Sequence, residues 1–212
     1  MQEVVRQTYM QDFGYYKTYK NFLTLQESEH LSKVILRDEE EIKRIPINEN
    51  DHTDWELHNP HGLTQYHTVY NWLNHPDFIP LDLPTRIHNL PEFKNKPITI
   101  QCWGNILRQG ERLEEHTHGN ETTTPFYALN IFLSGNTQTG TYYYDAREYT
   151  PNEVGELHVI SSDVSHGVNT HLFQEPRISI AMDVYTDATQ IQEQKDLVRQ
   201  GRMSGSRFIH IS

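Results

Sequence analysis

The sequence predicts a mainly β fold, an antiparallel sandwich or barrel with flanking α-helices packed outside it. Residues 98–105 alternate apolar and polar side chains, which is the pattern of a half-buried strand. Further strand-like segments follow at residues 126–133, 140–145, 155–160 and 177–185, separated by clusters of Gly, Asn, Ser and Asp. Because no helical pattern lies between these segments, an antiparallel sheet is favoured over alternating βαβ units.

The N-terminal part of the chain is expected to support this sheet. Residues 9–22 are rich in aromatics without a clean period, and we expect an early strand, an arm packed on the core or, alternatively, a homodimer contact. Thr24 and Glu27 have the spacing of a capping box, and apolar residues then recur at helical spacing. This pattern predicts a helix over residues 25–44.

Three further segments complete the expected elements. A second helix is predicted over residues 64–74, where four apolar or aromatic side chains share a face, and prolines follow it. A short third helix is predicted from Pro84 toward Leu90. Residues 188–199 have the pattern of a closing helix.

Length and composition predict a single domain over residues 1–212. We expect residues 1–96 to form an arm and supporting helices, residues 97–186 the β core, and residues 187–212 a C-terminal helix and tail. The formal net charge of -11 works against binding to nucleic acid or to anionic membranes. No segment has the length and apolarity of a membrane span or a signal peptide, so we expect a cytoplasmic protein. The single cysteine, Cys102, excludes an internal disulfide and a cysteine-rich zinc site.

Three histidines have the spacing of candidate metal ligands. His116 and His118 would point to the same face of an extended strand, and His166 follows far enough downstream to return on another strand. Three protein ligands leave coordination positions open, as a catalytic metal site requires, although imidazole suits iron, copper, nickel and zinc alike. The chain holds 13 histidines, so spacing alone gives equal weight to the alternative that all three are ordinary turn residues.

A candidate carboxylate-binding pair lies on the last predicted strand. One face of residues 177–185 is apolar, and the other carries Arg177, Ser179, Ala181 and Asp183. A guanidinium fork beside a hydroxyl is suited to bind a carboxylate through charge-assisted hydrogen bonds. The alternative is that Arg177 only closes a strand and pairs with a nearby acid such as Asp183.

Together these features resemble the iron(II)- and 2-oxoglutarate-dependent dioxygenase superfamily, and within it small bacterial and phage proteins similar to prolyl hydroxylases. The resemblance covers roughly residues 98–185. It rests on Trp103-Gly104-Asn105, the turn at Gly110, His116-Thr117-His118, the hairpin from Leu133 to Tyr144, Gly155-Glu156-Leu157, His166 and Arg177-Ile178-Ser179. It implies a double-stranded β-helix (jelly roll, cupin-like) over residues 97–186, with helices outside it.

The resemblance also implies a mechanism and its residues. Fe(II) would be held at the mouth of the jelly roll by His116 and His166, and the distal carboxylate of the co-substrate 2-oxoglutarate by Arg177 and Ser179. The implied activity of this non-haem oxygenase is hydroxylation of a small polar molecule or a peptide, with release of succinate and CO2.

One position departs from the pattern of that superfamily. The second metal ligand, two residues after the first histidine, is usually Asp or Glu, whereas this chain has His118. Spacing ranks a three-histidine site first. Alternatively, Glu115, Glu121 or Asp145 supplies a carboxylate ligand.

Other interpretations stay open at this point. A cupin-type metal dioxygenase or isomerase that uses no 2-oxoglutarate would fit the His-x-His pair followed by Glu121. A non-catalytic jelly roll could bind a partner through Tyr142–Tyr144. Tyr127 and Asn130 are further candidates to contact a co-substrate or substrate, with barrel packing as their alternative. Trp103 and Asn105 share a strand face that could line the site, and for Trp103 a core position is favoured.

Overall fold

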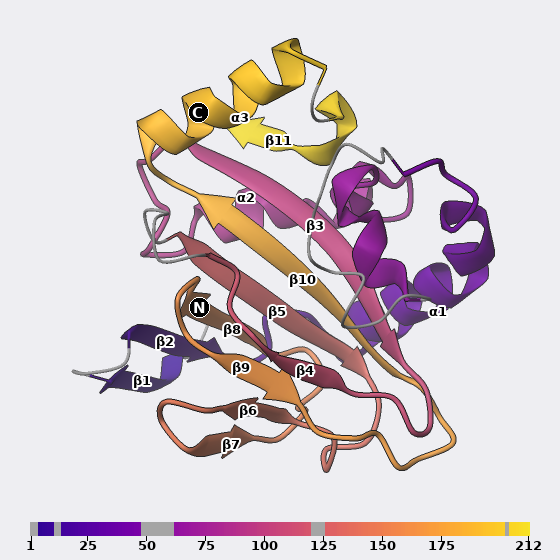
Figure 1. The fold of residues 1–212 in the computed structure, drawn as a ribbon. Coiled ribbons are helices and arrows are strands. Elements are labelled where there is room, and N and C mark those ends of the chain that lie inside the picture. Colours follow the sequence, from indigo (N-terminus) through magenta and orange to yellow (C-terminus); the bar gives the residue numbers. More distant parts are fainter. Residues whose placement is uncertain (1–3, 11–13, 48–61, 120–125, 202–203) are drawn as a thin grey trace.

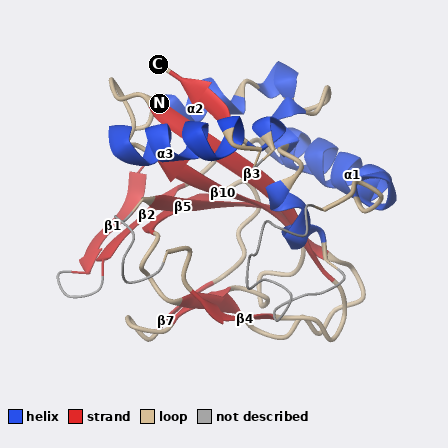
Figure 2. Ribbon diagram, turned by 45° about the horizontal axis from the view of Figure 1, so that its top comes forward, coloured by secondary structure: helices blue, strands red, loops and turns tan. Residues whose placement is uncertain are grey.

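The computed structural model describes residues 4–10, 14–47, 62–119, 126–201 and 204–212. In this part of the chain the strands form two antiparallel sheets that face each other (Figures 1 and 2). None of the helices in these ranges is long and apolar enough to cross a membrane.

The larger sheet contains seven strands within the described residues. Their spatial order is β1 (Val4–Met10), β2 (Gly14–Tyr19), β8 (Leu157–Ser161), β5 (Tyr127–Ser134), β10 (Arg177–Tyr185), β3 (Ile98–Leu107) and β11 (Ile209–Ile211). The aromatic N-terminal segment therefore provides two strands at one edge of this sheet, in agreement with the expected early strand.

The smaller sheet contains four short strands within the same ranges. Their order is β4 (Leu113–His116), β9 (His166–Val168), β6 (Thr141–Tyr143) and β7 (Glu148–Thr150). Strands β4, β7 and β9 were not expected from the sequence pattern, because each is too short to show a clear period of two.

Helices cover the face of the larger sheet that is turned away from the smaller one (Figure 2). The main helix, α1 (Leu25–Ile42), places Leu31 and Ile35 in the same apolar core as Ile178 and Ile180 of β10. The predicted capping box is present, because the Thr24 hydroxyl accepts from the Glu27 amide at 3.1 Å and the Glu27 carboxylate accepts from the Thr24 amide at 2.7 Å. The expectation of helices outside the β core is thus confirmed.

The segment predicted as one helix over residues 64–74 is instead two 3-10 helices, η2 (Leu63–Thr68) and η3 (Trp72–Asn74). Asn71 between them is extended, with φ of -115°. Its Nδ2 donates to the Ile100 carbonyl at 3.1 Å and to the Arg207 carbonyl at 2.9 Å. These tertiary hydrogen bonds interrupt the helix where local periodicity predicted that it would continue.

The remaining helices follow the sequence expectations more closely. The short helix α2 (Leu83–His88) has Pro84 in its first turn, and α3 (Ala188–Arg199) has the predicted bounds. Two single-turn elements, η4 (Ile79–Leu81) and η5 (Gly205–Arg207), lie in connecting segments. Helix α3 packs through Ile191 in a separate cluster with Phe126, Tyr185 and Phe208.

Gly135, directly after β5, lets the chain turn against the start of β10. Its φ is +120°, and a Cβ atom at this position would lie 2.8 Å from the Cα atom of Arg177. We expect Gly135→Ala to lower the free energy of unfolding by about 3 kcal/mol, because left-handed strain adds to a backbone clash. Urea denaturation followed by circular dichroism measures this loss.

Gly110→Ala is the matched control. Gly110 also has a positive φ of +90°, but no described atom lies within 4 Å of an added Cβ. The expected loss is about 1 kcal/mol, from strain alone. Equal losses for the two variants would show that the close approach to Arg177 carries no energetic weight.

Candidate functional site

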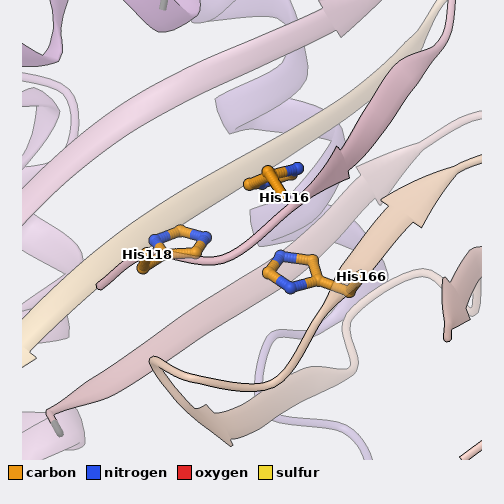
Figure 3. A group of neighbouring side chains, drawn as sticks. All are labelled: His116, His118 and His166. Carbon is orange, nitrogen blue, oxygen red and sulfur yellow. The ribbon is translucent and has the colours of Figure 1, made fainter. Parts of the chain in front are cut away.

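Three histidines converge between the two sheets (Figure 3). His116 ends β4 and lies opposite His166, the first residue of β9, while His118 follows two residues after His116. The ring centroids are 4.4 Å apart for His116 and His166, 5.2 Å for His118 and His166, and 5.4 Å for His116 and His118. One nitrogen of each ring lies within 4.8 Å of the others. The structure therefore brings together all three histidines that the sequence singled out.

Hydrogen bonds fix the tautomers of His116 and His166. The Nδ1 of His116 lies 2.8 Å from the Glu114 carbonyl, and the Nδ1 of His166 lies 2.9 Å from the Val164 carbonyl. A carbonyl oxygen can only accept, so each ring carries its proton on Nδ1 and its lone pair on Nε2. Burial, together with the neighbouring His116 and His118, holds the pKa of His166 well below its usual value. Its ring is neutral near pH 7, which is the form that binds metals.

His118 is held by a charged partner. Its Nδ1 lies 2.7 Å from Oδ1 of Asp183, which projects from β10, and both side chains are largely buried. The ring also lies against Trp103, with centroids 5.8 Å apart. The sequence offered Asp183 as a partner for Arg177, and this assignment is wrong. Strand alternation placed Asp183 on the correct face, but only the tertiary fold shows which histidine it meets.

A pocket lies between the sheets beside the histidines, with about 600 Å³ of space that is not filled by atoms, including the part that is open to solvent. Its lining includes residues of β3, β5, β8 and β10 from the large sheet and of β4, β6 and β9 from the small one. Among the described lining residues Arg177 is the sole permanently charged side chain, and no carboxylate is present.

Arg177 is buried in the wall of this pocket, with 1% of its surface exposed. Its Nε donates to the Thr139 carbonyl at 3.2 Å, and its Nη1 donates to the Ser179 hydroxyl at 3.3 Å. The guanidinium carbon lies 5.1 Å from the ring centre of Phe132. Burial lowers the pKa of Arg177 to about 10. No carboxylate in the described part of the chain forms an ion pair with it.

Asn130 and Tyr127, the other candidates on β5, occupy different environments. Asn130 lines the pocket, and its buried Nδ2 has no hydrogen-bond partner among the described residues. Tyr127 packs beside Phe93, with ring centroids 5.1 Å apart, and is not part of the pocket lining. Trp103 and Asn105 line the pocket from their shared strand face. For Trp103 the sequence favoured a core position, and its side chain is buried, with 3% exposed, as well as part of the pocket wall.

Sequence reasoning missed two residues of the pocket wall. Tyr143 is buried, and its hydroxyl lies 3.2 Å from Nδ1 of His158, which also lines the pocket. The sequence treated Tyr142–Tyr144 as one contact surface, whereas Tyr143 faces inward and Tyr144 is exposed. The alternation of side chains along β6 was the signal that could have separated them.

Two of the three carboxylates considered as alternative ligands, Glu115 and Asp145, bind Ser165 instead. Glu115 is exposed and accepts from the Ser165 hydroxyl at 2.6 Å. Asp145, also exposed, accepts from the Ser165 amide at 3.3 Å. Glu121, which the cupin interpretation also uses, lies outside the described residues.

Comparison with known proteins finds likeness in structure rather than in sequence. No family model matches the chain, and no curated protein matches it. Several solved structures do. The 2-oxoglutarate-bound viral collagen prolyl hydroxylase vCPH from Paramecium Bursaria Chlorella virus-1 is 10% identical, with a TM-score of 0.55 over 83% of this chain and 98% of that chain.

Two further solved structures give slightly higher TM-scores. HygX from Streptomyces hygroscopicus, with nickel and 2-oxoglutarate bound, is 12% identical, with a TM-score of 0.59 over 88% of each chain. SnoK, a non-heme α-ketoglutarate-dependent carbocyclase from nogalamycin biosynthesis, is 13% identical, with a TM-score of 0.59 over 95% of this chain and 93% of that chain. At these identities the likeness concerns the fold. The chain has the jelly-roll fold of 2-oxoglutarate-dependent enzymes, with its helices outside, as the sequence resemblance implied.

Proposed function

We propose that this protein is a non-haem Fe(II)- and 2-oxoglutarate-dependent oxygenase that hydroxylates a small polar molecule or a peptide and releases succinate and CO2. The observation that carries the proposal is a buried arginine without a carboxylate partner among the described residues, in the wall of a pocket where three histidines converge. The fold shared with 2-oxoglutarate-dependent enzymes supports the same assignment.

The three histidines fit a divalent transition metal. His116, His118 and His166 each hold a hydrogen-bond acceptor at Nδ1, which leaves Nε2 as the nitrogen that carries the lone pair. Imidazole ligands suit Fe(II) as well as its neighbours in the first transition series. Three protein ligands would leave coordination positions open for a co-substrate and for oxygen.

Arg177 and its surroundings fit a carboxylate of 2-oxoglutarate. A buried cation is costly without a counter-charge, and the described pocket lining supplies none. Ser179 lies beside the guanidinium and can donate its hydroxyl hydrogen to the same carboxylate. The partnerless Nδ2 of Asn130 offers one more donor to an oxygen atom in the pocket. An anionic ligand would satisfy all three groups.

Iron with bound 2-oxoglutarate supplies the oxygen-activating and C–H-oxidising chemistry that no side chain has. The protein itself positions the co-substrate and limits its contact with water. Arg177 and Ser179 orient the co-substrate toward the histidines, and apolar side chains such as Leu113, Ile160 and Val168 limit the access of water to the pocket.

The main alternative is a cupin-type metal enzyme that uses no 2-oxoglutarate, since three histidines suit it equally well. It assigns no ligand to the buried Arg177, and for this reason we favour the oxygenase. The two functions differ in what the pocket binds once the metal is present.

Anaerobic addition of Fe(II) and 2-oxoglutarate tests the proposed function. We expect a metal-to-ligand charge-transfer band in the visible spectrum, and succinate after oxygen is admitted. Arg177→Met should still bind the metal but should give neither the band nor succinate, because the carboxylate loses its charged partner. Arg112→Met, which removes an exposed arginine outside the pocket lining, is the control and should behave as wild type.

The possible outcomes separate the candidate functions. Folded wild-type protein that binds Fe(II) without the band or succinate would favour the cupin-type enzyme. Protein that binds no metal would favour the non-catalytic jelly roll.

The proposal also predicts a trade-off between stability and binding at Arg177. Its pKa falls from 12.5 to about 10 on folding, so the protonated form destabilises the fold at every pH below about 10, by roughly 3 kcal/mol. Replacing Arg177 with Met removes this destabilisation. The variant also loses the hydrogen bonds to Thr139 and Ser179, which offsets part of the gain in stability. Without ligands, we expect this variant to be about 1 kcal/mol more stable than wild type at pH 7 in urea denaturation.

Arg112→Met serves as the control here too, with an expected change within about 0.5 kcal/mol. A loss of more than about 1 kcal/mol for Arg177→Met would show that the guanidinium is compensated within the protein itself. In that case Arg177 would need no ligand to balance its charge.

A further inference from the structure

We propose that Asp183 is the anionic member of the metal site and acts on the metal through His118. This inference rests on the proposed metal site. It makes Asp183 a positioning residue that tunes metal affinity without touching the metal.

The geometry singles out one of the three histidines. His116 and His166 each donate from Nδ1 to a neutral backbone carbonyl, whereas His118 donates to the Asp183 carboxylate at 2.7 Å. The side chains of His118 and Asp183 are 6% and 11% exposed, so solvent screens their interaction only weakly. Asp183 therefore delivers its negative charge to the site through His118.

Asp183 has a fixed position and one ionic partner. It lies in the middle of the large sheet, where β10 pairs it with Gln101 of β3 and Ala128 of β5. His118 is the one group in the described part of the chain that forms an ion pair with it. A buried carboxylate needs a counter-charge, and the imidazole can transmit that of a bound metal.

The physical effect follows from the hydrogen bond. A carboxylate that accepts from Nδ1–H draws the proton toward itself and raises the electron density at Nε2, which makes the imidazole a stronger ligand. It also holds the ring in one orientation. Three neutral imidazoles supply no charge of their own to a divalent cation, so Asp183 provides the nearest compensation within the described residues.

Cobalt(II) binding to the purified protein, measured by competition with a chromophoric chelator, tests this inference without relying on catalysis. Asp183→Asn removes the charge at nearly constant shape, and its amide can also donate to Nδ1 and favour the wrong tautomer. We expect the variant to bind cobalt 10–100-fold more weakly than wild type. Asp145→Asn is the control. It removes an exposed carboxylate that accepts from the Ser165 amide and not from a candidate ligand, and this variant should bind cobalt as wild type does.

Making the same change in a His118→Asp variant tests whether Asp183 acts on the metal through His118 or only stabilises the structure. His118→Asp places a carboxylate at the ligand position itself, where a second carboxylate nearby is redundant and repulsive. In this background, adding Asp183→Asn should leave cobalt affinity unchanged or raise it. An equal loss in both backgrounds would assign Asp183 a structural role and overturn the inference.

The outcomes also separate this inference from the proposed function. Wild type that binds no cobalt would overturn both. Wild type that binds cobalt, with Asp183→Asn equal to it, would overturn the role of Asp183 alone. If Asp183→Asn alone does not fold, Asp183→Glu keeps the charge and should stay within tenfold of wild type, and the two His118→Asp variants still decide the question.

Discussion

Side-chain alternation along β10 is the constraint on which both the core and the pocket of this protein depend. The strand lies between β3 and β5 and is fully buried along its length. Every second residue, Ile178 and Ile180 among them, enters the core beneath α1. On the opposite face, Arg177, Ser179 and Ala181 line the pocket and Asp183 contacts His118, so a slip of one residue in register would bury Arg177 and Asp183 in the apolar core. The register of β10 therefore determines both the packing of the core and the position of the site residues.

Strand β10 also carries a buried charged group that lowers the stability of the fold. A sandwich that needed only to be stable would place apolar or small residues on both faces of β10. Arg177 is buried instead, with its pKa lowered to about 10 and with no carboxylate beside it in the described structure. Asn130, on the neighbouring strand, has a buried donor without a partner in the described part of the chain. Unsatisfied groups that cluster in one cavity indicate a ligand site more strongly than either group does alone.

The sequence predicted the long elements well, because many residues share in each signal. Strands β3 and β10 alternate over nine or ten residues, and α1 has both a capping box and an amphipathic period. Strands β4, β7 and β9 of the small sheet escaped prediction because they have only three or four residues, whereas β6 lies within the predicted strand segment at residues 140–145. The interrupted helix near Asn71 was missed for a different reason, since distant carbonyl groups decide its conformation.

The candidate site shows the same division between local and tertiary information. His116 and His118 could be found from their spacing and Arg177 from its place on a strand, because each signal is local. The partner of His118 could not be found in this way. Asp183 reaches it only after β10 and the segment that follows β4 have been placed on facing sheets. Asp183 lies 65 residues from His118 in the chain, so a single sequence carries no direct record of this hydrogen bond.

The charges of the pocket favour a dianionic co-substrate over a neutral one. The described lining and the groups behind the three histidines hold one permanent cation, Arg177, and one carboxylate, Asp183. A divalent metal at the proposed site would leave a net charge of about two positive units. In the proposed function, the two carboxylates of 2-oxoglutarate would cancel this charge, one at the metal and one at Arg177. A ligand with a single carboxylate would leave either the metal or the buried guanidinium uncompensated, because no carboxylate lies among the described lining residues.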